Sequence, residues 1–460
     1  MADPRHISAG FRRRLRDELA LWRAEGLVAP EQADALAARY RLADLAKESS
    51  STLLLSLYIV GALLVAGGVV SFVAANWGGL PPAPKVALIV LAMLTCHMGG
   101  FYLWKVRQTH PWLGHALIVL GTLVFGANLG LMAQIFNIHS DIYNGVAAWA
   151  VGAMAVAYAV GSVPNAFIAV AASFVWLCGA EGYSDWTSVY YPLLAATVFM
   201  PFAYRRRSAV ITAMALAVIA LGMMVGALHG RGPDWRVVVL AAVGAGSLYV
   251  AAGLLAVQKE ALRRVGIAAV VMGAIGLGLV ACSLSFLEGV KELRYSTWRL
   301  FDSPGLVSAG AAAFCSIPLW VVHVIGWRRM GPMRPLSLGL FAAVVLTAGA
   351  IGLALTHPSS QPYHYRPAET VDITAAVLGN IAVLALAVGL LASAMAAVDR
   401  RLFWPGVLLL VLLVVSRFFE YESNLMWKAT AFLACGLGII GGGLWFESYL
   451  RRRRAADEQP

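Results

Sequence analysis

Apolar runs of about 20 residues recur from Leu53 almost to the C-terminus, and short polar connections separate them. A run of this length crosses the hydrocarbon core of a bilayer, about 30 Å thick, as a helix. Strands of a transmembrane barrel would show shorter segments of alternating polarity. The pattern therefore predicts an all-α, polytopic membrane protein. We expect about 14 spans, at residues 53–74, 84–104, 112–136, 143–160, 163–180, 189–204, 208–228, 236–257, 265–287, 304–326, 336–356, 373–397, 402–419 and 427–447.

These spans divide the chain into three parts. Residues 1–52 precede the first span, residues 53–447 form the transmembrane bundle, and residues 448–460 form a basic tail. The first part carries apolar residues at helical spacing, interrupted by Gly26 and Pro30, which suit a helix end and a helix start. We therefore expect a cytoplasmic amphipathic helical hairpin followed by a linker. The predicted core of the hairpin consists of Leu15, Leu19, Trp22, Leu36 and Tyr40.

Two short helices bury too little surface to be stable alone. The hairpin, residues 11–41, should therefore pack on another surface. The cytoplasmic face of the bundle, the lipid surface and a cytoplasmic protein partner are the three candidates.

The charge distribution indicates how the chain is oriented. Of its residues, 60% are hydrophobic and 13% charged, and the mean hydropathy is +0.75. The formal charge of +11 lies in short clusters between the spans, so the expected partner is a lipid bilayer and not nucleic acid. Cytoplasmic connections hold most Lys and Arg, and a cytoplasmic N-terminus places the clusters at 205–207 and 451–454 inside. Both termini are then cytoplasmic, and the same alternation fits 12 spans as well as 14.

The sequence contains no motif of a known catalytic chemistry. It has no GxxxxGK[ST] phosphate loop, no HExxH metal motif and no GxSxG nucleophile elbow. Its five cysteines lie in apolar runs and form no CxxC pair, so neither a zinc site nor a disulfide framework is indicated. We expect no cofactor, metal or catalytic residue, and an enzyme is the less favoured interpretation.

A polar group interrupts the apolar pattern in the segment LMAQIFNIHSDIYN (131–144). Gln134, Asn137 and Asp141 stand at i, i+3 and i+7, the spacing of one helix face, and Asn128 lies one to two turns earlier. An amide in lipid must find a partner. This face should therefore point into protein. Either Gln134 and Asn137 bind the third span to a neighbour while Asp141 caps or solvates its exit, or the group lines a polar opening on the outer side.

Two other segments are expected near the same side of the membrane. ANWGGLPPAPK (75–85) forms a tight turn that includes Asn76, and SRFFEYES (416–423) places Arg417 three residues before Glu420. A charge within a bilayer is costly unless it is paired, so an Arg417–Glu420 ion pair is expected. We predict that Asn76, Gln134, Asn137, Arg417 and Glu420 converge as a polar cavity or as a closed clamp.

Less specific signals are the lone histidines and the glycine pairs. His97 and His323 lie within apolar runs, and each is expected to hydrogen-bond a neighbouring helix or to carry a proton. GxxxG pairs, which allow close helix contact, occur at Gly126/Gly130, Gly222/Gly226 and Gly438/Gly442.

Several short segments together resemble a known family. They are WRAEGL (22–27) with Gln32 and Tyr40 after it, ANWGGLP (75–81), AQIFNI (133–138), and SRFFEY (416–421) before a glycine-rich span that ends in RRRR. The chain resembles bacterial predicted membrane proteins of the domain of unknown function two-one-five-seven family, most specifically over residues 11–160. The resemblance implies a polytopic inner-membrane protein and assigns no activity.

Three functions remain open from the sequence. The spans and the outer polar groups favour a transporter-like or flippase-like protein for a small or lipid-linked substrate. The hairpin favours a non-transporting scaffold or sensor that recruits a cytoplasmic partner. The outer loops 288–303 and 357–370 would suit an intramembrane transferase acting on a lipid-linked substrate. The substrate, the partner and the oligomeric state are not specified by the sequence.

Overall fold

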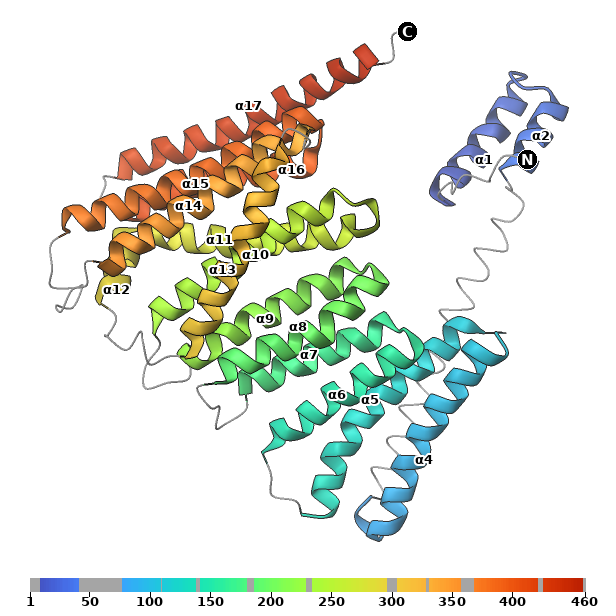
Figure 1. Cartoon of the computed structure of the whole chain (residues 1–460). Coiled ribbons are helices and arrows are strands. Elements are labelled where there is room, and N and C mark those ends of the chain that lie inside the picture. The colour runs from blue at the N-terminus through green and yellow to red at the C-terminus, as the bar shows by residue number, and fades with distance from the viewer. Residues whose placement is uncertain are drawn as a thin grey trace. The chain divides into compact units, whose positions relative to one another are not determined.

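The computed structural model describes the chain as a series of helices (Figure 1). The described residues are 9–40, 77–108, 110–137, 141–179, 186–228, 234–295, 304–327, 331–356, 368–420 and 425–457. No strand occurs within these ranges, which confirms the all-α prediction. The chain divides into two compact units, Met1–Leu88 and Ile89–Pro460.

The first unit contains the hairpin that the apolar spacing predicted. Its helices are α1 (Ala9–Ala24) and α2 (Pro30–Arg39), and a short 3₁₀ turn, η1 (Trp77–Gly79), lies later in the chain. Gly26 turns the chain between α1 and α2 with φ of +73°, a backbone region that glycine adopts without strain. Leu19 and Ala33 are buried at the centre of the hairpin. Trp22, Leu36 and Tyr40 are partly buried against them, and Leu15 of α1 is half-buried.

The rest of the described chain is a succession of longer helices. They are α4 (Pro82–Phe101) with the π-helical turn η2 (Tyr102–Val106), α5 (Pro111–Ile135), α6 (Ile142–Val160), α7 (Val163–Gly179), α8 (Thr187–Arg206), α9 (Ala209–Leu228), α10 (Trp235–Val257), the 3₁₀ turn η3 (Glu260–Leu262), α11 (Arg263–Leu284), α12 (Leu287–Tyr295), α13 (Pro304–Ile325), the 3₁₀ turn η6 (Gly331–Met333), α14 (Arg334–Thr356), α15 (Thr370–Ala397), α16 (Arg400–Glu420) and α17 (Leu425–Asp457). Every span predicted from 84–104 onward coincides with one of these helices. The predicted span at 53–74 and Asn76 lie outside the described residues.

Many of these helices are suited to a membrane. Within the described residues, nine are long and apolar enough to cross one, and two further apolar stretches, Val163–Gly179 and Ala209–Val225, are shorter. The sequence-based figure of about 14 also counted less apolar helices such as α8 and α16. The chain is therefore an all-α polytopic membrane protein.

Small residues bring the helices of the second unit into close contact. A Cβ atom on Gly253 of α10 would lie 2.8 Å from the carbonyl oxygen of Gly266 on α11. A Cβ on Gly339 of α14 would lie 2.5 Å from the carbonyl oxygen of Ala385 on α15. Only glycine fits at these positions, because any Cβ would clash with the neighbouring backbone. Such close contact stabilises the bundle, since helices in lipid associate through van der Waals packing and not through the hydrophobic effect.

Helix α12 lies at one end of this bundle. It contacts α10, α11, α14 and α15. Because α10 and α11 pack antiparallel, as do α14 and α15, the start of α10, the end of α11 and the start of α15 meet at α12. We call this the α12 end of the bundle. It brings together charged residues that are far apart in the sequence.

Candidate functional site

The polar face predicted for residues 131–144 is not a continuous helical face. Helix α5 ends at Ile135, and Asn137 follows with φ of +48°. Asp141 lies beyond this turn and caps α6, where its carboxylate accepts a 3.0 Å hydrogen bond from the backbone N–H of Tyr143. The spacing i, i+3, i+7 assumed an uninterrupted helix, and the chain turns within it.

The expectation that this face points into protein is wrong for Gln134 and Asn137, whose side chains are exposed. The same expectation is correct for Asn128, which lies one to two turns earlier. That amide is buried and donates a 3.2 Å hydrogen bond to the backbone carbonyl of Ile89 on α4. Asn128 therefore provides the interhelical contact that we had expected from Gln134.

Arg417 and Glu420 form the ion pair that their spacing on α16 predicted. Arg417 also donates from Nη1 to the carbonyl oxygen of Ser285 at 2.7 Å and from Nη2 to its hydroxyl at 3.0 Å. Its guanidinium lies over the ring of Phe286, 4.7 Å from the centroid. These contacts bind α16 to the corner between α11 and α12.

Glu420 completes this corner by capping α12. Its Oε1 accepts a 2.6 Å hydrogen bond from the backbone N–H of Leu287, the first residue of α12. The first N–H groups of a helix have no partner within it, and a carboxylate there also interacts favourably with the helix dipole. Glu420 thus stabilises the start of α12 while it neutralises Arg417.

Arg294 of α12 makes the most deeply buried ion pair of the described chain. Its side chain, 4% exposed, donates to Asp372 at 2.6 Å and to Glu369 at 2.9 Å. Asp372 is fully buried in the first turn of α15 and also accepts from the backbone N–H of Glu369 at 2.9 Å. Burial lowers the pKa of Arg294, but its hydrogen bonds to the two carboxylates and their charges outweigh this and raise that pKa above its usual value.

Arg236 binds the other end of α12. Its Nε donates to the carbonyl oxygen of Leu293 at 2.9 Å, and its Nη2 donates to that of Arg294 at 2.8 Å. The last carbonyls of a helix lack partners within it, and a cation there also complements the dipole. Beneath α12, Val290 and Leu293 are buried in the bundle core. Helix α12 is therefore held at both ends and on its inner face.

We call this cluster the α12 clamp and define it by five residues: Arg236, Arg294, Asp372, Arg417 and Glu420. They come from α10, α12, α15 and α16. Each one is hydrogen-bonded to another member or to backbone within this corner. The clamp therefore joins α10, α12, α15 and α16 through charged side chains at the α12 end.

The structure brings only part of the predicted polar site together. Arg417 and Glu420 belong to the α12 clamp, whereas Gln134 is on α5, a helix that packs on α6 and α7. The other three members of the clamp, Arg236, Arg294 and Asp372, were not among the predicted site residues. Arg294 and Asp372 are 78 positions apart, so no local spacing pairs them.

Among the described residues, two further polar side chains are fully buried without a hydrogen-bond partner: Asn165 on α7 and His323 on α13. The imidazole of His323 lies edge-on to Trp320, with ring centroids 5.6 Å apart. His97 differs, since its Nδ1 lies 3.0 Å from the carbonyl oxygen of Met93 one turn earlier. Neither histidine therefore hydrogen-bonds a neighbouring helix.

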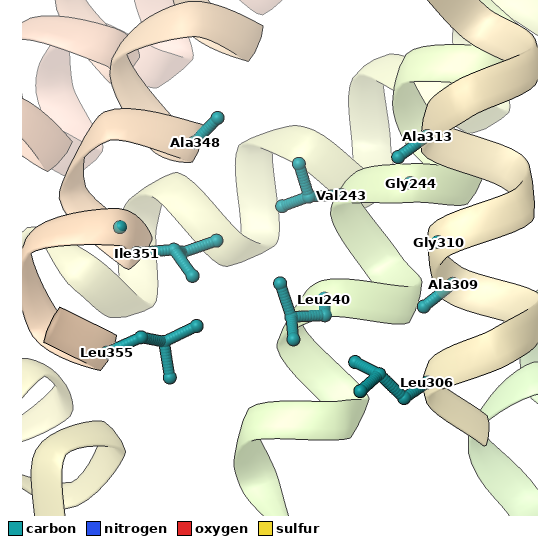
Figure 2. Close-up of a pocket in the computed structure, with 11 residues that line it drawn as sticks. Leu240, Val243, Gly244, Leu306, Ala309, Gly310, Ala313, Ala348, Ile351 and Leu355 are labelled. Carbon is teal, nitrogen blue, oxygen red and sulfur yellow. The ribbon is translucent and has the colours of Figure 1, made fainter. Parts of the chain in front are cut away.

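A pocket of about 260 Å³ lies among α10, α13 and α14 near the same end of the bundle (Figure 2). Leu240 and Val243 of α10 form its floor, and side chains of α13 and α14 face them from either side. All of its lining side chains are apolar or glycine. The pocket therefore suits a hydrocarbon ligand and offers no group for an ion.

No group of three or more His, Cys, Asp or Glu residues placed to hold a metal ion occurs in the part of the chain that the structure describes. The five cysteines are free thiols. Most of the outer loops 288–303 and 357–370, on which a transferase would depend, lie outside the described residues.

Long apolar helices, closed at one end by a buried ionic cluster, define the chain as an α-helical integral membrane protein. Residues 20–165 match the family model described as predicted membrane protein (DUF2157). The resemblance seen in the sequence is thus confirmed over this N-terminal region, and the description assigns no activity. No curated protein and no solved structure matches the chain.

Proposed function

We propose that this protein is a non-transporting membrane scaffold or sensor, in which the bundle is the anchor and the hairpin recruits a cytoplasmic protein. The α12 clamp is the observation that carries this proposal. Its five charged groups are bonded to one another and to backbone, so none is free to bind a substrate unless the clamp breaks. Breaking a buried ion pair is strongly unfavourable, which suits a static anchor.

The proposed orientation follows the basic residues. The clusters at 205–207, 263–264 and 400–401 lie at the end of the bundle away from α12, and basic connections favour the cytoplasm. The N-terminal hairpin and the C-terminal tail are then cytoplasmic, and the α12 end faces the other side. The proposed membrane is the bacterial inner membrane, as the resemblance implies.

The surface of the hairpin favours a protein as its partner rather than an anionic lipid surface. Leu27 is 70% exposed, and Leu21 is also exposed. Charges of both signs surround them, for example Arg23, which pairs with Asp34 at 3.6 Å. Anionic lipids attract a uniformly basic face, whereas a mixed surface with exposed leucines fits another protein.

Cysteine accessibility tests whether the clamp opens. Ser285 is buried beneath Arg417, and a Ser285→Cys variant would be made in a chain whose five cysteines are replaced by serine. We expect a membrane-impermeant maleimide to leave it unmodified in sealed vesicles of either orientation, and the same variant with Arg417→Ala to react. Rapid modification with the clamp intact would show that this corner opens to water, and would contradict a static anchor.

Photo-crosslinking in cells tests the recruiting role. A photoreactive amino acid at Leu27 should give one discrete adduct with a cytoplasmic protein, and Trp22→Asp, which disrupts the hairpin core, should abolish it. A probe at Leu433, which is exposed on α17, is the control and should not give this adduct. Adducts with phospholipid alone would refute a protein partner.

The apolar pocket favours a second candidate, a transporter-like or flippase-like protein for a lipid-linked substrate. Its hydrocarbon-lined volume could hold the lipid part of such a substrate. Purified protein in vesicles would then move a fluorescent phospholipid between leaflets, which an impermeant quencher detects. Movement no faster than in protein-free vesicles is the result expected for a scaffold.

A further inference from the structure

The apolar pocket is a groove lined by α10 in the middle and by α13 and α14 on either side (Figure 2). Gly310 on α13 and Gly352 on α14 border it, and both are exposed. A Cβ atom added to either glycine would meet nothing within 4 Å. The groove therefore exists partly because these two positions lack side chains.

The surroundings of the groove show that it faces the hydrocarbon of the membrane. Helices α10, α13 and α14 are all long and apolar enough to span a bilayer. Large apolar side chains are exposed next to the groove, including Val307 and Phe314 on α13 and Val345 on α14. Apolar cavities do not hold ordered water, so water is not the occupant.

The size of the groove selects between the remaining occupants. Its α13 lining runs from Leu306 to Ala313, which is about 10 Å of helix. A helix with its side chains is about 10 Å across, so a segment of that length fills roughly 800 Å³, which is more than the groove holds. An unbranched hydrocarbon chain, whose carbons approach neighbours at about 4 Å, is slender enough to lie between α13 and α14.

We infer that this groove is a binding site for one acyl chain of a membrane lipid. The chain lies along α10 between α13 and α14, and fills the space left open at Gly310 and Gly352. Because lipid tails are as apolar as the groove, the affinity comes from van der Waals contact with its walls. This inference goes beyond the proposed scaffold role, and neither the hairpin nor the topology enters it.

The test uses the full-length protein in vesicles containing a phospholipid with a diazirine in its acyl chain. The protein is extracted into detergent, which removes loosely bound lipid, before illumination and peptide mass spectrometry. We expect labelling to concentrate on residues 306–313 and 348–355. Gly310→Leu and Gly352→Leu should reduce it to the level found on α5, because a Cβ atom at either position meets no neighbour and the rest of the leucine would occupy the groove.

Gly130→Leu is the matched control, since Gly130 on α5 is exposed and equally free of neighbours. It should leave the labelling of the groove unchanged. Labelling spread evenly over all exposed apolar helices would refute a specific acyl-chain site. The same holds if the filled variants retain full labelling. A loss of oligomeric mass in those variants, with labelling unaltered, would mean that a second copy of the chain occupies the groove.

Discussion

Replacing Asp372 with alanine would test the central contact of the α12 clamp. The substitution removes the carboxylate that accepts from Arg294 at 2.6 Å and from the backbone N–H of Glu369 at 2.9 Å. Arg294 would remain buried and would keep its contact with Glu369 at 2.9 Å. Glu369 is itself 50% exposed, so water screens much of its charge.

The expected loss follows from these contacts. Removing one partner of a buried ion pair typically costs about 3 to 5 kcal/mol. Because Glu369 still neutralises part of the charge of Arg294, we expect the lower end, about 3 kcal/mol. A variant with both Arg294→Met and Asp372→Leu removes both charges of this buried pair and should lose less than Asp372→Ala alone, since an apolar replacement of a buried pair is often nearly neutral.

Reversible unfolding in mixed micelles, followed by tryptophan fluorescence, measures these free energies. Glu288→Gln is the matched control on the same helix. Glu288 is 61% exposed and pairs with Lys291 at 3.2 Å, and a pair with so exposed a partner contributes about 0 to 1 kcal/mol. If Asp372→Ala cost no more than Glu288→Gln, or if the double variant were the least stable, the clamp would not stabilise the bundle as described.

Three further experiments have defined outcomes. Asn128→Leu should lower the free energy of unfolding by about 1 kcal/mol, as expected for an interhelical hydrogen bond, whereas Gln134→Leu should be neutral; equal losses would contradict their different burial. Trp22→Asp should increase amide exchange in the hairpin without preventing membrane insertion, and unchanged exchange would argue against its core position. A reporter active only in the cytoplasm should work after Arg207 and fail after Ser360; activity at Ser360 would overturn the proposed topology.

The spans could be predicted from the sequence because their cause is local. A backbone in hydrocarbon must satisfy its own hydrogen bonds, and one helix does so without any other part of the chain. Apolar runs such as 236–257 and 373–397 therefore specify helices by themselves, and α10 and α15 coincide with them. Arg417 and Glu420 are a second local case, because a spacing of three residues brings them together on any helix.

The apolar periodicity did not predict where the helices end or which of their faces are in contact. The predicted polar face at 131–144 required α5 to continue, but the helix ends at Ile135. The glycine pairs of the sequence were informative only in part. A Cβ on Gly126 or Gly222 would clash with a side chain of another helix, whereas a Cβ on Gly130 would meet nothing within 4 Å. Other close backbone approaches, such as that of Gly253 to Gly266, join residues of two different helices. A repeat within one helix does not reveal its neighbour.

The sequence by itself determined the class of this protein, its helical spans and the i, i+3 ion pair of α16, because each depends on residues within one segment. Only the tertiary structure decided that Arg294 meets Asp372, that Arg236 binds the last carbonyls of α12, and that Glu420 caps its start. These partners lie between 57 and 133 positions apart. Buried charges are stable only when they are paired or hydrogen-bonded, and the packing of α10, α11, α15 and α16 selects their partners.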